Sequence, residues 1–305
     1  MTKRFLLALL LGSWLAGPLF AQSTAQQRQQ IRAQTDARLH AIIDTTAGVM
    51  GVAALDLVGD DDVLINADQV FPQGSTIKIP ILMEVYRQAE AGTFALSDRR
   101  TLTDAVKVGG SGRLQTLGTG SELTIYDLCV LMISISDNTA TNMLIDLVGM
   151  DRVNQTMADL GLEHTRLQRK MMDTAARARG DENLSTPAEA AQIMEMLHRG
   201  TFVSRAASDE MLAILRKTGG GDLAAGVPGD VAVPFKPGGI PGVSTEWALV
   251  ELDAQPYALV VMGNYGRGGF DAAMTALSRT LYDYYWRMSR ASAYGTYVDP
   301  AQLNR

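Results

Sequence analysis

One short stretch of this sequence pairs a serine with a lysine at a spacing that suits nucleophilic catalysis. Ser75 and Lys78 stand three positions apart within residues 71–80, which read FPQGSTIKIP. If a helix begins near Ser75, Lys78 lies one turn later on the same face. A serine hydroxyl needs a base, and a lysine serves when burial and nearby positive charge lower its pKa. A helix-capping serine beside a solvated lysine has the same spacing, so the pair alone does not decide between the two.

A second polar group follows an apolar run. Residues 131–135 read LMISI and lead directly into Ser136, Asp137 and Asn138. This pattern predicts a polar group placed against a buried helix, in which Ser136 passes a proton towards a leaving group and Asn138 holds a substrate amide. Serine, aspartate and asparagine also favour helix N-termini, so an ordinary helix cap is the alternative.

The third group is Lys236-Pro237-Gly238-Gly239, which follows a strand expected at residues 231–235. Lys236 would direct its charge at a site from the edge of a sheet. Gly238 and Gly239 would allow a substrate backbone to approach closely. The alternative is a turn between strands with an exposed lysine.

The remaining pattern indicates the elements that would position these groups. The expected strands lie at 48–57, 63–71, 231–235, 247–252 and 257–262. Helical periodicity covers 22–45, 75–154 with a glycine-rich break at 109–112, 187–217 and 270–288, and 165–184 read as a long loop. Because strands at both ends of the chain bracket a helical middle, we expect an α+β fold with an inserted helical subdomain.

Taken together and in this order, Ser-x-x-Lys, Ser-Asp-Asn and Lys-x-Gly form the motif set of class A β-lactamases and penicillin-binding proteins. The chain therefore resembles the class A β-lactamases from about residue 28 to about residue 290. The resemblance implies a β-lactamase/transpeptidase-like α+β fold, with an antiparallel sheet flanked by terminal helices and an inserted all-α subdomain. The α/β subdomain would comprise 28–71 and 218–290, and the helical subdomain 72–217.

The resemblance also implies a role for each motif residue. Ser75 would be acylated and Lys78 would help to deprotonate it. Ser136 would relay a proton, Asn138 would bind the amide side chain of the substrate, and Lys236 would support the substrate's acid group or the proton relay. The oxyanion hole would be the backbone N–H groups of Ser75 and Gly239, with Gly238 beside them at the substrate.

The chain departs from the family at the positions that govern hydrolysis and recognition. The family activates its hydrolytic water with a loop glutamate, in a Glu-x-x-x-Asn pattern. Here Arg169 matches the arginine that opens the loop, but Met171 falls where that glutamate would stand. Asp173 is the candidate substitute base, with a role as a partner of loop arginines as its alternative. Pro237 replaces the usual hydroxyl residue, and Glu246 stands where an arginine often binds the substrate carboxylate, so we expect weakened penicillin recognition and slow deacylation.

Length, charge and residue composition argue against several other classes of protein. The 305 residues suffice for one large domain or two intimate subdomains, and the net charge of -6 without a basic run argues against nucleic acid as a partner. The single cysteine, Cys129, lies in an apolar stretch and is expected in the core. The three histidines lack the spacing of zinc ligands, and no Gly-x-Ser-x-Gly elbow accompanies them. We therefore expect no metal, no cofactor and no Ser-His-Asp triad.

The N-terminus has the pattern of a secretory signal peptide. Lys3 and Arg4 precede an interrupted apolar run over 5–20, and Ala21 offers a cleavage point. This predicts a signal peptide at 1–21 and a periplasmic or secreted protein; an uncleaved anchor is the alternative. We expect no stable membrane span after processing, a loosely held tail at 291–305, and a monomer.

These observations predict an exported serine hydrolase that acts through a Ser75 acyl-enzyme, with β-lactam ring hydrolysis, in weak form, as its reaction. One alternative is a D-alanyl-D-alanine peptidase or esterase of the same fold. The other is a sensor that binds β-lactam or peptidoglycan without turnover. The expected partner is a small β-lactam or an acyl-D-alanyl compound in each case.

Overall fold

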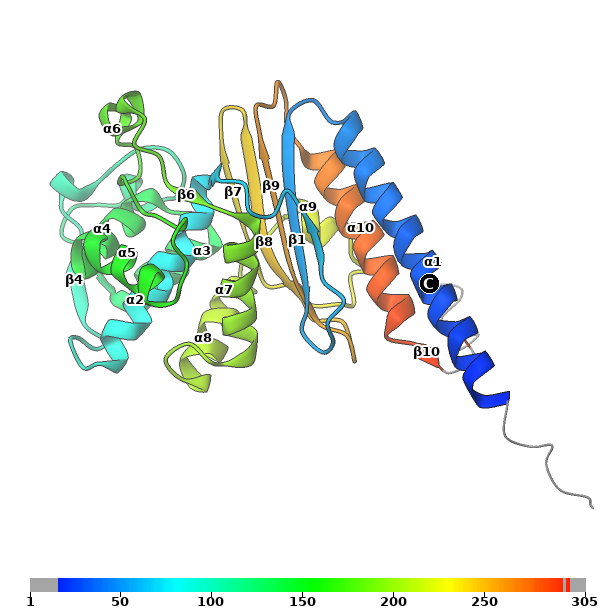
Figure 1. Cartoon of the computed structure of the whole chain (residues 1–305). Coiled ribbons are helices and arrows are strands. Elements are labelled where there is room, and N and C mark those ends of the chain that lie inside the picture. Colours follow the sequence, from blue (N-terminus) through cyan, green and yellow to red (C-terminus); the bar gives the residue numbers. More distant parts are fainter. Residues whose placement is uncertain (1–15, 293–294, 297–305) are drawn as a thin grey trace, which may run out of the picture.

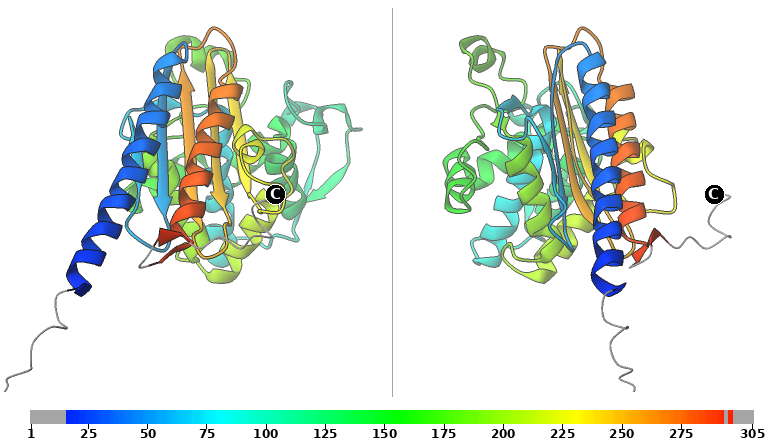
Figure 2. Two further views of the ribbon diagram at one scale, coloured as in Figure 1. Left: turned by 90° about the vertical axis from the view of Figure 1, so that its right-hand side faces the viewer. Right: turned by 45° about the vertical axis from the view of Figure 1, so that its right-hand side comes forward.

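A five-stranded antiparallel sheet separates two layers of helices (Figure 1). In the computed structural model, which describes residues 16–292 and 295–296, helices α1 (Ala16–Thr45) and α10 (Asp271–Met288) lie side by side on one face of the sheet (Figure 2). Helix α7 (Pro187–Arg199) packs on the other face and connects it to the remaining helices. The predicted α+β fold, with terminal helices flanking the sheet and a helical subdomain inserted between its strands, is confirmed.

The sheet brings together strands from the two ends of the chain, in the order β2-β1-β9-β8-β7. Within β8, Trp247 and Leu249 belong to the core shared with the helical subdomain, whereas Ala248 and Val250 belong to the core beneath α1 and α10. Because helices cover both faces, the central strands are apolar nearly throughout instead of alternating. The strands are β1 (Val49–Asp56), β2 (Val63–Ile65), β7 (Phe235–Ile240), β8 (Val243–Val250) and β9 (Tyr257–Asn264).

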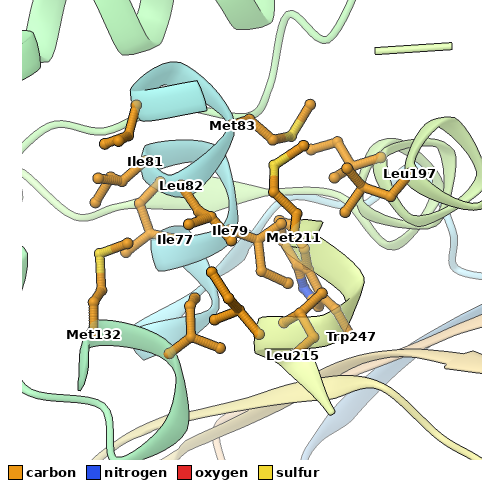
Figure 3. Close-up of a cluster of buried hydrophobic side chains, with 14 of the residues drawn as sticks. Ile77, Ile79, Ile81, Leu82, Met83, Met132, Leu197, Met211, Leu215 and Trp247 are labelled. Atoms are coloured by element: carbon orange, nitrogen blue, oxygen red, sulfur yellow. The ribbon is translucent and has the colours of Figure 1, made fainter. Parts of the chain in front are cut away.

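Helix α2 (Lys78–Glu90) runs through the centre of the helical subdomain. Its residues from Lys78 to Tyr86 are all buried, so this part of the helix is enclosed on every side. Figure 3 shows Ile79 and Leu82 of this helix among side chains that include Met132, Met211 and Trp247. The other helices of this subdomain and the short one behind the sheet are α3 (Ile125–Ser134), α4 (Asn138–Val148), α5 (Met150–Asp159), α6 (Thr174–Arg179), α8 (Arg205–Leu215) and α9 (Asp222–Ala225).

Four further two- and three-residue strands form two small pairs around the helices. They are β3 (Phe71–Pro72) with β6 (Leu184–Ser185), and β4 (Arg99–Thr101) with β5 (Glu122–Thr124). The first pair joins the start of the helical subdomain to the end of the long loop. The strand expected over 63–71 is therefore only partly right, because just its two ends pair. The loop expected over 165–184 contains one short helix, α6.

The strand expected at 231–235 is wrong in its bounds. Strand β7 begins at Phe235 and includes Lys236 through Gly239, which the sequence analysis placed after the strand. Pro237 pairs with Glu246 of β8 although it has no N–H to donate. Because β7 is the edge strand of the sheet, the outer side of Pro237 faces no partner strand, which is the place in a sheet where proline is tolerated.

The structure describes only parts of the predicted signal peptide and of the predicted C-terminal tail. Residues 1–15 of the predicted signal peptide lie outside the described residues, and the expected cleavage point after Ala21 falls within α1. In the expected tail, Ala291–Ser292 pairs with Gly295–Thr296, and the other residues of 291–305 lie outside the described part. Among the described residues, no helix is both long enough and apolar enough to cross a membrane.

Candidate active site

Ser75 lies where the helical subdomain meets the edge of the sheet. It occupies a short 3₁₀ turn, Gly74–Ile77, and α2 begins directly after it at Lys78. The helix thus begins three residues later than expected, but Lys78 still follows Ser75 by one turn. Ser75 is half-buried and lines a cavity, whereas the side chain of Lys78 is fully buried.

Two glycines let the Ser75 turn contact strand β7 directly. Gly74 has a φ of 55°, and a Cβ placed there would lie 2.7 Å from the backbone nitrogen of Gly239. A Cβ on Gly238 would lie 2.8 Å from the backbone nitrogen of Ser75. Either clash would push the turn away from the strand, so both positions require glycine. This close approach places Ser75 and Gly239 next to each other in the lining of one cavity, so their N–H groups remain the candidate oxyanion hole.

Lys78 is held by the second motif through three contacts. Its Nζ lies 2.8 Å from the carbonyl oxygen of Ser136, 2.9 Å from Ser136 Oγ and 3.0 Å from Asn138 Oδ1. Burial and the nearby charge of Lys236 hold the pKa of Lys78 well below its usual range, against the opposing charge of Asp137. A lowered pKa favours the neutral amine, which is the form of lysine that can accept a proton.

Ser136 connects the two buried lysines. Lys236 Nζ donates to Ser136 Oγ at 3.2 Å and to the carbonyl oxygen of Pro237 at 2.9 Å. Ser136 has a φ of 56°, a left-handed conformation that is uncommon outside glycine and that turns its carbonyl towards Lys78. Lys236 is 1% exposed, which excludes the alternative of an exposed lysine in a turn. The structure thus brings Lys78, Ser136, Asn138 and Lys236 together.

The helix cap that was the alternative for Ser136-Asp137-Asn138 is present, and Asp137 forms it. Asp137 is the N-cap of α4 and accepts from the N–H of Ala140 at 2.9 Å. The same carboxylate accepts from the N–H groups of Arg113 and Leu114, at 2.6 and 2.8 Å. It thereby fixes the glycine-rich loop against α4. Asn138 donates one amide N–H to the carbonyl oxygen of Gly109 at 3.1 Å and also lines the cavity.

Asn142, which the sequence analysis did not single out, fixes the part of the long loop nearest to Ser75. Its side chain accepts from the N–H of Met171 at 2.8 Å and donates to the carbonyl oxygen of Met171 at 3.1 Å. Met171 is 8% exposed and lines the cavity with Ser75. Asn142 lies on α4 one turn beyond Asn138, and that helical spacing is the signal that was available in the sequence.

Asp173 lies in the same wall of the cavity, as the N-cap of α6. Its Oδ1 accepts from the N–H of Ala176 at 2.9 Å, and the side chain is exposed. The alternative role as an ion-pair partner of loop arginines is not what the described residues show. Arg169 pairs with Glu182 at 2.7 Å, and Arg179 pairs with Asp181 at 2.9 Å.

The cavity joins all three motifs to the long loop. Its volume is 220 Å³. The residues that line it are Gly74, Ser75, Gly110, Ser111, Asn138, Arg169, Met171, Met172, Asp173, Thr174, Arg177, Gly239 and Ile240. One wall is therefore the edge of β7 and the opposite wall is the loop from Met171 to Arg177, with Ser75 between them.

The expectation that Glu246 would repel a substrate carboxylate is wrong. Glu246 is 1% exposed and accepts from the N–H groups of Asp222 and Leu223 at the start of α9, at 2.9 and 3.2 Å. Its neighbours on β8 point to the other face, where Thr245 Oγ1 donates to the carbonyl oxygen of Gln73 at 2.7 Å. Burial raises the pKa of Glu246 to about 7. Its charge therefore lies behind the sheet, away from the cavity.

Lys236 gives the protein a measurable pH dependence of stability. Burial lowers the pKa of Lys236 to about 7 from 10.5, against the opposing charge of Glu246. The unfolded chain thus binds more protons than the native state between these values, and stability rises with pH, by up to about 1.4 kcal/mol per pH unit. We expect Lys236→Met to show a smaller rise, because only the contribution of the buried Lys78 remains, as measured by urea unfolding at about pH 7.5 and about pH 9.5. The exposed Lys217→Met should keep the parent's rise, and an equal slope in all three proteins would contradict the argument.

The rival enzyme classes find no support among the described residues. His40, His164 and His198 lie on α1, before β6 and on α7, and none lines the Ser75 cavity. Within the described part of the chain, no group of three or more histidine, cysteine, aspartate or glutamate residues is arranged to hold a metal ion. Cys129 is fully buried in α3, as expected for a core residue.

Comparison with known proteins agrees with this site. The family model described as the Beta-lactamase enzyme family matches residues 34–285. The β-lactamase L2 of Stenotrophomonas maltophilia is 31% identical over 225 residues, which cover 70% of this chain and 73% of that protein. The chain belongs to the β-lactamase enzyme family. Its relatives are class A serine hydrolases of amide bonds, and the chain is an enzyme of that type.

Solved structures of a β-lactamase and of PBP-A have the same fold as this chain. A β-lactamase from Sphaerobacter thermophilus is 33% identical, with a TM-score of 0.76 over 83% of this chain and 97% of its own. The structure of PBP-A is 27% identical, with a TM-score of 0.77 over 83% of this chain and 96% of its own. A leucine-to-glutamate variant of PBP-A has been captured as an acyl-enzyme complex with penicillin G.

Proposed function

We propose that this β-lactamase-family chain opens β-lactam rings through an acyl-enzyme on Ser75 and releases the product slowly. The observation that carries the proposal is the buried Lys78, which contacts Ser136 and Asn138 while standing one turn from a serine that lines a cavity. A neutral amine at this position is the base that a serine hydroxyl requires. The residues that line that cavity include no histidine that could act as this base.

The acylation step uses the residues around Ser75 in a defined order. Lys78 takes the hydroxyl proton as Ser75 Oγ attacks the β-lactam carbonyl carbon, and the N–H groups of Ser75 and Gly239 hold the developing oxyanion. When the carbon–nitrogen bond breaks, the ring nitrogen takes a proton from Ser136 Oγ, which in turn recovers one from Lys78. Asn138, with one amide N–H already bonded to the backbone, has the other for the amide carbonyl of the substrate.

Deacylation is the step for which the site is poorly equipped. Met171 lines the cavity where the family uses a glutamate, and a thioether cannot take a proton from water at neutral pH. The acid in this wall is Asp173, whose Oδ1 is bonded to Ala176 and whose Oδ2 has no bond among the described residues. Asp173 is therefore the proposed base that activates water for hydrolysis of the Ser75 ester.

Replacing Asp173 with asparagine tests that role. Asparagine is an equally good N-cap, so α6 should be retained while the base is lost. We expect the acyl-enzyme of Asp173→Asn to decay about 10²-fold more slowly than that of the parent, followed by intact mass after removal of free penicillin. Asp181→Asn is the matched control, because Asp181 pairs with Arg179 outside the cavity. Deacylation of Asp173→Asn at the parent rate would remove Asp173 from the mechanism.

Intact-mass spectrometry over time tests the function as a whole. The protein is mixed separately with a penicillin, a cephalosporin and a D-alanyl-D-alanine peptide. A transient adduct on Ser75 with accumulating product supports slow β-lactam hydrolysis. An adduct that persists without turnover would favour a sensor. Absence of any adduct would contradict the proposal and direct the search to esters and other acyl donors.

One observation favours a second function, a D-alanyl-D-alanine peptidase or esterase. Such enzymes need Ser75, Lys78 and Ser136 for acylation but do not need the loop glutamate, and Met171 stands in its place. Faster turnover of the peptide or of a simple ester than of any β-lactam would select this second function.

The proposal includes export and a monomeric protein. The charged and then apolar segment before Ala21 supports removal of residues 1–21 and release to the periplasm or the medium. N-terminal sequencing of the protein recovered after secretion would locate the cleavage point. Retention of residues 1–21 would favour a membrane anchor instead.

A further inference from the structure

Within the proposed function, the loop wall of the cavity must meet the acyl side chain of the substrate. The reacting carbonyl lies at Ser75, its oxygen lies at the N–H of Gly239, and the amide group lies at Asn138. A substituent beyond that amide extends away from these groups, between the edge of β7 and the wall formed by residues 171–177. The charges on that wall therefore act on the acyl side chain.

Three charged residues of the long loop line the cavity, Arg169 just before this wall and Asp173 and Arg177 within it, and their bonds differ. Arg169 is 8% exposed, and its guanidinium is bound to Glu182 at 2.7 Å, so its charge is neutralised within the loop. Asp173 binds the N–H of Ala176 at the start of α6. Arg177, one turn further along α6, is exposed and makes no ion pair among the described residues. Arg177 is therefore the positive charge on this wall that is available to a ligand, four residues along the chain from the carboxylate of Asp173.

We propose that Arg177 selects substrates whose acyl side chain carries a carboxylate. The inference rests on the proposed acylation of Ser75 and names the substrate class of the same site. A guanidinium offers paired N–H groups that match a carboxylate in geometry, and such charge-assisted bonds are stronger than neutral ones. Lys78 and Lys236 are both buried and do not line the cavity, so neither can bind a carboxylate of the acyl side chain there.

Three penicillins that differ only in side-chain charge test the proposal: benzylpenicillin, its α-carboxy derivative and its α-amino derivative. The readout is the second-order rate constant for labelling of Ser75. We expect the parent to prefer the α-carboxy over the α-amino compound by about tenfold, an effect that added salt weakens. Arg177→Gln should bring this ratio close to unity, and Arg177→Glu should reverse it.

Arg179→Gln is the matched control. Arg179 lies on the same helix, is paired with Asp181 at 2.9 Å and does not line the cavity, so the ratio should remain at the parent value. A parent without preference, or an Arg177→Gln protein that keeps it, would overturn the proposal. A preference for the α-amino compound that Asp173→Asn abolishes would assign the selectivity to Asp173 instead. If none of the three compounds labels the parent, the proposed β-lactam chemistry itself fails, and this inference with it.

Discussion

Ser75→Ala is expected to abolish covalent labelling by penicillin and to lower turnover of any acyl substrate by about 10⁴-fold or more. The substitution removes the attacking oxygen, and no other described residue offers a hydroxyl at the same point between the oxyanion N–H groups and Lys78. The half-buried position accepts alanine without a clash, so the fold should be retained. Intact mass measures the adduct, and product release measures turnover.

Ser134→Ala is the control for this substitution. The hydroxyl of Ser134 donates to the carbonyl oxygen of Val130 at 2.7 Å, at the end of α3 and outside the cavity. That variant should label and turn over like the parent. An adduct that persists in Ser75→Ala and maps to Ser136 would assign the nucleophile to the second motif. Unchanged turnover in Ser75→Ala would remove acyl-enzyme chemistry from the protein.

The parts of the site that could be predicted from the sequence are those in which local spacing determines the geometry. Ser75 and Lys78 occupy successive turns whether the first turn is 3₁₀ or α, so a shift of the helix start did not separate them. The apolar run before Ser136 predicted a buried helix, and α3 ends there with the polar group against its end. The first two motifs predicted their own local geometry in this way, and the order of the three motifs indicated that they converge.

The parts that could not be predicted depend on which way a strand faces and where it lies in the sheet. Glu246 follows Thr245 by one residue, and a strand sends neighbouring side chains to opposite faces. A one-residue uncertainty in register thus decides between a charge in the cavity and a charge behind the sheet. The bounds of β7 were missed for a related reason, because Pro237 and two glycines predict a turn unless the strand is known to lie at an edge.

The long loop shows the same limit at the level of side-chain partners. Glu182 lies thirteen residues beyond Arg169 in the chain, yet the two form an ion pair that closes the loop on itself. Asn142 reaches Met171 across 29 residues of sequence. The ion pair has no periodic signal, and the spacing of Asn138 and Asn142 shows only that the two asparagines share a helix face, because both contacts depend on how the loop folds back over α4. The sequence showed that Met171 replaces the loop glutamate. It did not show that Asn142 fixes the backbone of Met171 in place.

That fixed position makes Met171→Glu the second substitution with a large expected effect. The side chain of Asn142 is hydrogen-bonded to both the N–H and the carbonyl oxygen of Met171. A new side chain at position 171 is therefore attached to a fixed backbone, in the lining of the cavity that contains Ser75. A carboxylate at this point can take a proton from the water that attacks the Ser75 ester. We expect deacylation to accelerate about 10² to 10³-fold, measured as the decay of a preformed penicillin adduct by intact mass.

Met171→Gln separates the effect of charge from that of shape. Glutamine has nearly the volume of glutamate and cannot act as a base, so its acyl-enzyme should decay at the parent rate. Burial raises the pKa of a carboxyl at an 8% exposed position, so the gain of Met171→Glu should grow with pH as the group ionises. Equal acceleration by both variants would mean that opening the wall to water suffices. No acceleration by either would mean that the ester of Ser75 is closed to water from this side, and that hydrolysis depends on the approach from Asp173.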